Sequence, residues 1–266
     1  MSKSKKILGL VGSPRPDGLT NKLVSSALKG AEDIGATTEL VQMSECVVEA
    51  CKDCLPWVCA DNLRCTYKDT NLEIISEKLL NCDGVVWGTP VYWGDTTAMV
   101  RLLMLKLFRL YARSQSFKSI PAFGIAIAGG SGNGLISGLR PLYHFFRIMW
   151  MRGITPLPVT RFDMDEALEK AEFSGREIAE MEKKPFESRD ERDYWYDSIP
   201  YLARSNAEER RLLAAVTYEA LPAEKKQLVT GSWASADILS TAGKTLESMN
   251  EISRIYDSSF EKHISQ

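Results

Sequence analysis

Four cysteines lie close together in the sequence, and their spacing suits metal chemistry. They occur in the fifteen-residue segment Cys51-Lys-Asp-Cys54-Leu-Pro-Trp-Val-Cys59-Ala-Asp-Asn-Leu-Arg-Cys65. A [4Fe–4S] cube takes one thiolate on each iron, and a compact run with one Cys-x-x-Cys pair can wrap around it. A Cys₄ zinc site is one alternative, although zinc sites usually have two such pairs, and uncoordinated thiols are another. The spacing favours the cluster, with Cys51, Cys54, Cys59 and Cys65 as its ligands.

The two other cysteines, Cys46 and Cys82, are predicted to be spare. Cys46 lies just before the run and is the candidate to replace one of the four ligands. Cys82 ends an amphipathic helical pattern, where a cysteine usually acts as a small buried hydrophobe.

A Gly/Pro-rich loop, residues 12–21, lies between an expected strand and an expected helix. Backbone N–H groups at a helix N-terminus attract anions, and hydroxyl and guanidinium groups add donors for a phosphate. The loop lacks the endings of a nucleotide-hydrolysing P-loop and of a dinucleotide site. The alternative is an ordinary turn with a capping threonine. The candidate phosphate-binding residues are Ser13, Arg15, Gly18, Thr20 and Asn21.

Two later loops also follow expected strands. Residues 88–94 carry two adjacent aromatic residues between Pro and Gly, and could present backbone amides and a flat face to a planar ring; aromatic pairs are as often core. Residues 129–134 are Gly-rich, which allows close backbone approach but is weak evidence alone. The candidate ring-binding residues are Pro90, Val91, Tyr92, Trp93, Gly94, Gly129 and Gly130.

Alternating strands and helices must position these loops. Short apolar runs predict strands at 6–11, 37–42, 84–87, 122–128 and 154–160. Helical spacing predicts helices at 20–34, from Asp69 or Thr70, from Gly94 to about 113, at 135–151 and at 165–184. This order predicts an α/β fold with a doubly wound, five-stranded parallel sheet. Such sheets bind ligands beyond the carboxyl ends of their strands, so we expect the loops to form a single site.

Together these motifs resemble the NADPH-dependent FMN reductase family and, within it, the iron–sulfur flavoproteins. The resemblance rests on Gly12-Ser13-Pro14-Arg15 with Thr20, on Thr89-Pro90-Val91-Tyr92-Trp93-Gly94 and on the 129–134 loop, and it covers roughly residues 5–182. It implies a flavodoxin-like fold that holds the FMN phosphate in the first loop and the isoalloxazine against the later two. The sequence departs from the family pattern at Leu19, where the family has Asn, and at Arg101 and Leu105-Lys106, where it has Lys and Asp-Arg.

The resemblance and the cysteine segment together imply an FMN-dependent redox enzyme. A flavin exchanges electrons in pairs or singly and a cluster passes them one at a time, so the two link both kinds of chemistry. No side chain is assigned a catalytic role. The predicted redox partner is NAD(P)H or a ferredoxin-like protein. One alternative is an NAD(P)H-dependent FMN or quinone reductase whose cysteines hold zinc or nothing, and another is a non-catalytic redox module that docks on a larger enzyme.

Composition narrows the class of protein. The 266 residues carry a formal net charge of −2, which gives no electrostatic case for binding nucleic acid. No stretch approaches the ~20 apolar residues of a membrane span. The basic residues 1–6 precede only a short apolar run, so no signal peptide is expected and the protein is predicted to be cytoplasmic. A reducing compartment favours metal or redox chemistry for the cysteines over disulfides.

The composition changes after about residue 184 and predicts two parts. Residues 1–184 are expected to form the FMN-binding domain, with the cysteine segment inserted at 46–65, and residues 185–266 a helical extension. Within it, 186–204 is predicted to be a connecting arm, followed by helices at 207–221 and about 235–260. We predict that the extension packs on a neighbouring subunit of a homo-oligomer, a dimer or tetramer; the alternative is packing on its own domain. The first helix would bury Leu212, Leu213, Val216 and Leu221.

Overall fold

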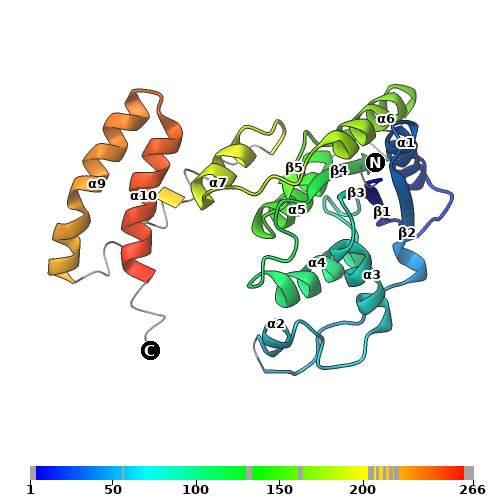
Figure 1. Cartoon of the computed structure of the whole chain (residues 1–266), viewed down its shortest axis with the longest axis horizontal. Helices are drawn as coiled ribbons and strands as arrows, with labels where there is room; N and C mark the ends of the chain where they lie inside the picture. The colour runs from blue at the N-terminus through cyan, green and yellow to red at the C-terminus, as the bar shows by residue number, and fades with distance from the viewer. Residues whose placement is uncertain are drawn as a thin grey trace. The chain divides into compact units, whose positions relative to one another are not determined.

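The computed structural model describes residues 4–55, 57–129, 134–160, 164–202 and 222–260, and six positions between the last two ranges: 207, 210, 211, 214, 215 and 218. The chain forms two compact units, Met1–Pro185 and Phe186–Gln266 (Figure 1). Within the described ranges, no helix has both the length and the apolar character that crossing a bilayer requires.

The first unit is built on a parallel sheet. Its strands are β1 (Lys6–Val11), β2 (Thr37–Gln42), β3 (Gly84–Pro90), β4 (Pro121–Ala128), β5 (Arg152–Gly153) and β6 (Leu157–Thr160). They lie in the order β2-β1-β3-β4-β5, with β6 also paired to β4, and all of these pairings are parallel. With β5 and β6 counted as one broken fifth strand, this is the doubly wound 2-1-3-4-5 order of flavodoxin-like sheets. The predicted fold class is therefore confirmed.

The fifth strand is interrupted where the sequence analysis expected it to be continuous. β5 pairs with the first two residues of β4, and β6 pairs with Ile125–Ala128. Pro156 and Pro158 have no backbone N–H to donate to a ladder, and proline is confined to edges and breaks of sheets. The expectation of one strand over 154–160 was wrong for this reason.

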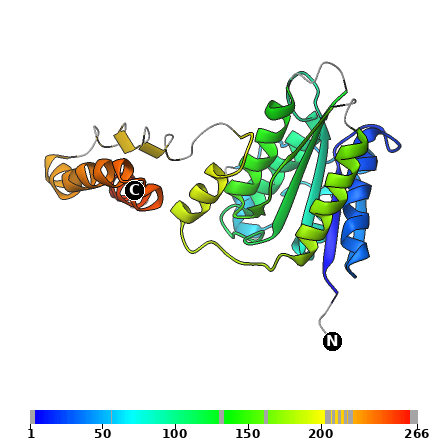
Figure 2. The same cartoon turned by 90° about the horizontal axis from the view of Figure 1, so that it is seen from above.

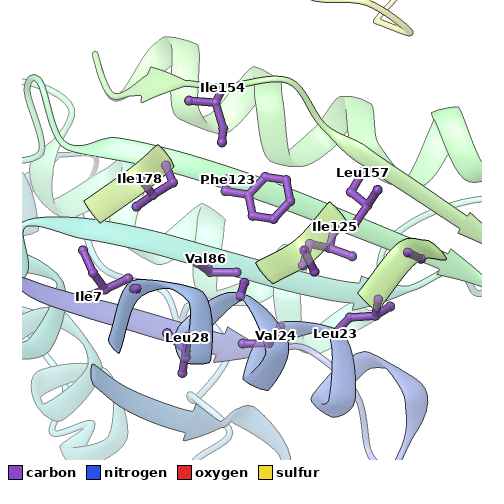
Figure 3. Packing of buried hydrophobic residues seen from close by; sticks show 14 of the residues in the cluster. Ile7, Leu23, Val24, Leu28, Val86, Phe123, Ile125, Ile154, Leu157 and Ile178 are labelled. Atoms are coloured by element: carbon purple, nitrogen blue, oxygen red, sulfur yellow. The ribbon is translucent and has the colours of Figure 1, made fainter. Parts of the chain in front are cut away.

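Helices cover both faces of the sheet (Figures 1 and 2). α1 (Leu19–Asp33) and α6 (Met164–Glu180) lie side by side on one face, and α3 (Thr70–Leu80), α4 (Ala98–Tyr111) and α5 (Leu135–Ile148) lie on the other. The central strands are buried on both faces, which explains why their sequences are continuous apolar runs. Figure 3 shows one interior layer, formed by strand and helix residues that include Ile7, Val24, Leu28, Val86, Phe123, Ile125, Leu157 and Ile178.

Two glycines let α1 and α6 touch backbone to backbone. A Cβ atom on Gly30 would overlap the carbonyl group of Glu172, and one on Gly175 would overlap the carbonyl group of Ala27. The hydroxyl of Ser26 donates to the carbonyl of Leu168 at 2.8 Å at the same crossing. The helix pair over the sheet therefore depends on the absence of side chains at these two positions.

The second unit is helical in its described residues and has its own buried interior. It contains α7 (Arg189–Asp197), α9 (Ala223–Thr241) and α10 (Thr245–Phe260). α7 lies in the segment predicted to be a connecting arm, and that prediction was wrong because this charged helix buries its acidic face. Asp190 and Asp193 pair there with the guanidinium of Arg210, and the hydroxyl of Ser253 donates to Asp190 at 2.7 Å.

The helix predicted over about 235–260 is two helices. α9 ends at Thr241 with Ala242 as its C-cap, and Gly243 takes a left-handed φ of 72° with its amide bonded to the carbonyl of Ser240, an ending that favours glycine. Ile252 and Ile255 of α10 are buried, whereas Ile238 of α9 is 70% exposed. Leu212, Leu213, Val216 and Leu221 lie outside the described residues. The packing of this unit on a neighbouring subunit stays a prediction.

Candidate functional site

The first predicted loop lies between β1 and α1, at the carboxyl edge of the sheet. Gly18 is the N-cap of α1 with an extended backbone, and no side chain there makes a capping hydrogen bond to the first helical turn. Ser13 and Thr20 are buried, Arg15 is exposed, and the backbone amide of Arg15 donates to the hydroxyl of Ser13 at 3.1 Å. A helix N-terminus with two hydroxyls and a guanidinium beside it has the donor set that a phosphate needs.

Two residues that the sequence analysis missed fix this loop. The side-chain amide of Gln42, at the end of β2, donates to the carbonyl of Ser13 at 2.5 Å, and Asn21 donates to Gln42 at 3.5 Å. The hydroxyl of Thr97 donates to the carbonyl of Gly12 at 2.8 Å and so joins the first loop to the segment that starts α4. A buried Gln at a strand end is the signal that could have indicated the first of these contacts.

The second predicted loop is a tight two-residue turn. Tyr92 and Asp95 exchange backbone hydrogen bonds of 2.9 and 3.0 Å, and the central residues Trp93 and Gly94 have φ values of 55° and 71°. Positive φ at both centres is the requirement of a type I′ turn, where a bulky Trp is strained. The guanidinium of Arg101 donates hydrogen bonds to both oxygens of the Asp95 carboxylate, at 2.9 and 2.7 Å. Because Arg101 lies in the first turn of α4, this helix fixes the position of the loop at residues 92–95.

The aromatic side chains of this turn face solvent instead of a core. Trp93 is 103% exposed and Tyr92 is 50% exposed. A large apolar side chain held in a strained, exposed position is typical of a ligand-contacting loop. The interpretation of this pair as core is therefore wrong.

The last residue of the third predicted loop, Gly134, lies close to the second loop. A Cβ atom on Gly134 would lie 2.8 Å from the Cα of Gly94 and 3.1 Å from Val91, and one on Gly138, in α5, would lie 2.8 Å from Val91. Gly129 is exposed at the end of β4, and residues 130–133, Gly130 included, lie outside the described residues. Gly134 thus shows the close backbone approach that the glycines predicted.

The residues at this edge fit an FMN. The first loop has hydroxyl, amide and guanidinium donors of the kind that a phosphate takes, and the second has backbone and exposed aromatic side chains of the kind that a planar ring takes. Pro90 and Val91 end β3, where the amide of Val91 is bonded to the carbonyl of Ile127 at 2.8 Å. The hydroxyl of Thr96, next to the turn, is buried and has no hydrogen-bond partner among the residues that the structure describes. An orphaned buried hydroxyl beside two open loops is consistent with a bound polar molecule.

The four cysteines of the motif line one cavity. Cys59 is buried, Cys54 and Cys65 are half-buried, and Cys51 is exposed. The donor set is therefore the one a [4Fe–4S] cube requires. The cavity is also lined by charged residues, which are Glu49, Lys52, Asp69, Lys106 and Arg109.

The cysteine segment is anchored to the second half of α4. It contains α2 (Val58–Asn62), between Trp57 and Leu63, whose φ values of 64° and 49° are left-handed. The Trp57 ring packs on Phe108, with ring centroids 5.7 Å apart, and under the guanidinium of Arg113 at 4.8 Å. Such stacking holds a strained backbone in place. The segment is thus an ordered part of the unit.

A buried ion pair lies at the wall of the same cavity. The ammonium of Lys106 donates to the Asp69 carboxylate at 2.5 Å, and both side chains are almost wholly buried. Burial raises the pKa of Asp69, but hydrogen bonds from Lys106 and from the amides of Leu72 and Glu49 outweigh it, so the pKa lies below its ordinary value. Asp69 caps α3, which confirms its predicted role.

No three His, Cys, Asp or Glu side chains in the described part of the chain stand close enough together to hold a metal ion. The four thiols of the motif line one cavity without forming such a group, either for zinc or for a cluster.

The cysteine cavity is separate from the three loops. Arg101 holds the aromatic turn, whereas Arg109, eight residues further along α4, lines the cavity. At ~1.5 Å rise per residue, they lie roughly 12 Å apart along the helix. The loops and the cysteine cavity are therefore two neighbouring regions, which α4 connects, and the single site expected of the loops stays a prediction.

Cys46 and Cys82 lie outside the cavity lining. The thiol of Cys46 donates to the carbonyl of Gln42 at 3.4 Å, and burial raises its pKa. Burial raises the pKa of the Cys82 thiol to about 12. Both shifts disfavour the thiolate, which is the form that binds a metal.

We expect Cys82 to resist alkylation in the folded protein. At pH 8, a pKa of about 12 leaves a thiolate fraction of ~10⁻⁴, so reaction with iodoacetamide should be roughly a thousandfold slower than for an ordinary exposed thiol. Peptide mapping by mass spectrometry measures the rate, with urea-unfolded protein as the control in which Cys82 reacts readily. Equal rates in folded and unfolded protein would contradict the assigned burial.

Comparison with known proteins shows the family to which the chain belongs. Residues 5–166 match the model of the NADPH-dependent FMN reductase family. An iron–sulfur flavoprotein of Methanocaldococcus jannaschii is 27% identical over 192 residues, which cover 67% of this chain and 97% of the relative. A second iron–sulfur flavoprotein of the same organism is 31% identical over 144 residues, covering 54% of this chain and 71% of the relative.

Solved structures agree on the fold. A putative quinone reductase from Klebsiella pneumoniae has a TM-score of 0.54 at 19% identity, covering 67% of this chain and 86% of that one. An NAD(P)H:quinone oxidoreductase from Methanothermobacter marburgensis has a TM-score of 0.52 at 13% identity, covering 66% and 100%. With its flavodoxin-like sheet and its three loops at the carboxyl edge, the chain belongs to the NADPH-dependent FMN reductase family and is an FMN-dependent oxidoreductase.

Proposed function

We propose that this protein couples the two-electron chemistry of FMN to one-electron transfer through a [4Fe–4S] cluster bound by Cys51, Cys54, Cys59 and Cys65. The observation that carries the proposal is that all four thiols line one cavity. The names of the curated relatives support it. When bound, a flavin supplies paired or single electron exchange, and a cluster supplies single electron exchange.

The residues of the three loops would hold the flavin. Ser13, Arg15 and Thr20, with the amides at the start of α1, would bind its phosphate, supported by Gly18 and Asn21. The backbone of Pro90–Gly94, the Tyr92 and Trp93 side chains and the backbone at Gly129 and Gly130 would meet the ring. In this arrangement the protein positions the cofactor and supplies no acid or base of its own.

The surface of the cysteine segment favours a one-electron protein partner. Leu55 is 77% exposed and Leu63 is 45% exposed, and the same segment exposes Lys52 and Lys68. Arg64 and Arg113 are paired with Glu73 and Asp61. Exposed apolar and basic side chains beside the cysteines could meet an acidic carrier such as a ferredoxin. NAD(P)H, the donor that the family name indicates, would serve at the flavin.

Protein purified without oxygen tests the proposal. We expect about one FMN, about four irons and about four sulfides per chain, and a broad blue absorbance that dithionite bleaches. Zinc in place of iron, or flavin with neither metal, would favour a simple NAD(P)H-dependent FMN or quinone reductase. In that case NADPH oxidation with free flavin or a quinone would proceed without any cluster signal.

Loss of one phosphate contact should weaken flavin retention. Arg15→Ala removes a charge-assisted hydrogen bond worth ~1.5–3 kcal/mol, so the dissociation constant for FMN should rise roughly 10- to 100-fold. Flavin fluorescence titration measures the constant, and Lys170→Ala, at an exposed position on α6, is the control. Mass spectrometry of the released flavin should find FMN; FAD, or unchanged affinity in Arg15→Ala, would contradict the phosphate site.

A further inference from the structure

We propose that the buried Asp69–Lys106 pair closes the cysteine segment into a fixed loop and sets the electrostatic environment of the cavity that its thiols line. The electrostatic part rests on the proposed cluster. The closure part rests on the contacts of the protein alone.

The Asp69 carboxylate holds both ends of the segment. One oxygen accepts the backbone amide of Glu49 at 2.9 Å, two residues before the first cysteine of the motif. The other oxygen accepts the amide of Leu72 at 3.0 Å, in the first turn of α3. All four cysteines therefore lie in a loop of about twenty residues whose ends meet at one side chain.

Lys106 fixes that closure point to the body of the unit. Its ammonium donates to the oxygen that also holds Glu49, and both side chains of the pair are at most 4% exposed. A carboxylate this deeply buried needs a paired cation, because an uncompensated buried charge is strongly destabilising. Since Lys106 lies in the middle of α4, the loop is clamped to the same helix that holds the aromatic turn.

The pair also places opposite charges at the cavity wall. Both residues line the cavity, together with Arg109. A cube bound by four thiolates is negatively charged and gains one more negative charge on reduction, and nearby charge tunes its potential. Lys106 therefore favours the reduced cluster and Asp69 the oxidised one, so that removing either charge alone should shift the midpoint potential, in opposite directions.

Hydrogen exchange of the full-length protein, as purified, tests the closure. Asp69→Asn leaves one acceptor oxygen where two are used, so the amides of residues 46–68 should exchange faster than in the wild type. Lys170→Met, which breaks an exposed ion pair of α6, should leave this segment unchanged. Exchange in Asp69→Asn identical to the wild type would overturn the closure.

Redox titration followed by electron paramagnetic resonance tests the electrostatic part. Lys106→Met should lower the midpoint potential of the cluster, and Asp69→Asn should raise it. Lys106→Arg keeps the positive charge, so its potential should stay near that of the wild type. The double variant Asp69→Asn/Lys106→Met leaves no unpaired charge, so it should fold even where Lys106→Met does not, with a potential near the wild type. A purely structural role would lower iron content in both single variants without opposite shifts.

The outcomes separate this inference from the proposed function. Wild-type protein without iron and sulfide contradicts the cluster and the electrostatic part, while hydrogen exchange still decides the closure. If the wild-type protein holds a full cluster, the proposed function stands. If the midpoint potentials of the two single variants are then unchanged, or shift in the same direction, the electrostatic role of the pair is overturned.

Discussion

Alanine at any one of Cys51, Cys54, Cys59 or Cys65 is expected to remove most of the iron and sulfide from protein purified without oxygen. Each iron of a cube takes one thiolate, and the loss of one ligand exposes an iron that is then released. The four thiols line one cavity and come from one anchored segment, so no single thiol is surplus. Colorimetric iron and sulfide assays, normalised to protein, measure the loss, while FMN content should stay near that of the wild type.

The two remaining cysteines provide matched controls in the same chain. Cys46→Ala and Cys82→Ala should keep full iron and sulfide, because neither thiol lines the cavity and burial raises the pKa of both. Full cluster content in Cys59→Ala would show that the ligand set is wrong. Loss in Cys46→Ala would show that Cys46 replaces one of the four, the substitution that the sequence left open.

A single added methyl group at the crossing of α1 and α6 should destabilise the first unit severely. Gly30→Ala or Gly175→Ala would place a Cβ against the carbonyl group of the facing helix, which cannot rotate aside as a side chain would. Overpacking costs typically ~1–3 kcal/mol and occasionally more, and a clash with backbone belongs at the upper end. A loss of about 3 kcal/mol would lower the melting temperature by roughly 6–12 °C for a domain of this size.

Thermal unfolding followed by circular dichroism measures this effect. Gly231→Ala is the control, because it makes the same substitution in α9, where an added Cβ meets nothing within 4 Å. There the change should be neutral or stabilising by up to about 1 kcal/mol, since Ala favours a helix over Gly. A melting temperature in Gly30→Ala equal to that of the wild type would mean that α1 and α6 can separate without loss.

The sheet could be predicted from the sequence because the local apolar runs and the order of strands and helices along the chain indicate the same fold. Apolar runs between turn residues located β1 and β2 to the residue, and the alternation of strands and helices led to the doubly wound fold. The loops were found because their glycines, prolines and hydroxyls follow those strands directly. The fifth strand was misjudged, since its hydrophobicity was weighed more heavily than the two prolines that interrupt it.

Contacts between distant segments could not be predicted in this way. Nothing near Lys106 in the sequence indicates its partner, and only the fold brings Asp69, 37 residues earlier, to its ammonium group. The segment 186–204 looked like a connecting arm because Arg210, the partner of its Asp190, lies outside it. The exposure of Trp93 depends on a turn geometry that its side chain disfavours, so the sequence left open whether this candidate ring-binding residue was part of the core.

The broken fifth strand also affects how the sheet meets other chains. A continuous strand at the edge of a sheet presents a row of free N–H and C=O groups that a strand from another molecule can extend. Here the edge is two short pieces, β5 and β6, with Pro156 and Pro158 removing two donors. This edge is therefore a poor template for strand addition, and the unbroken β2 at the opposite edge is the strand on which another chain could be added.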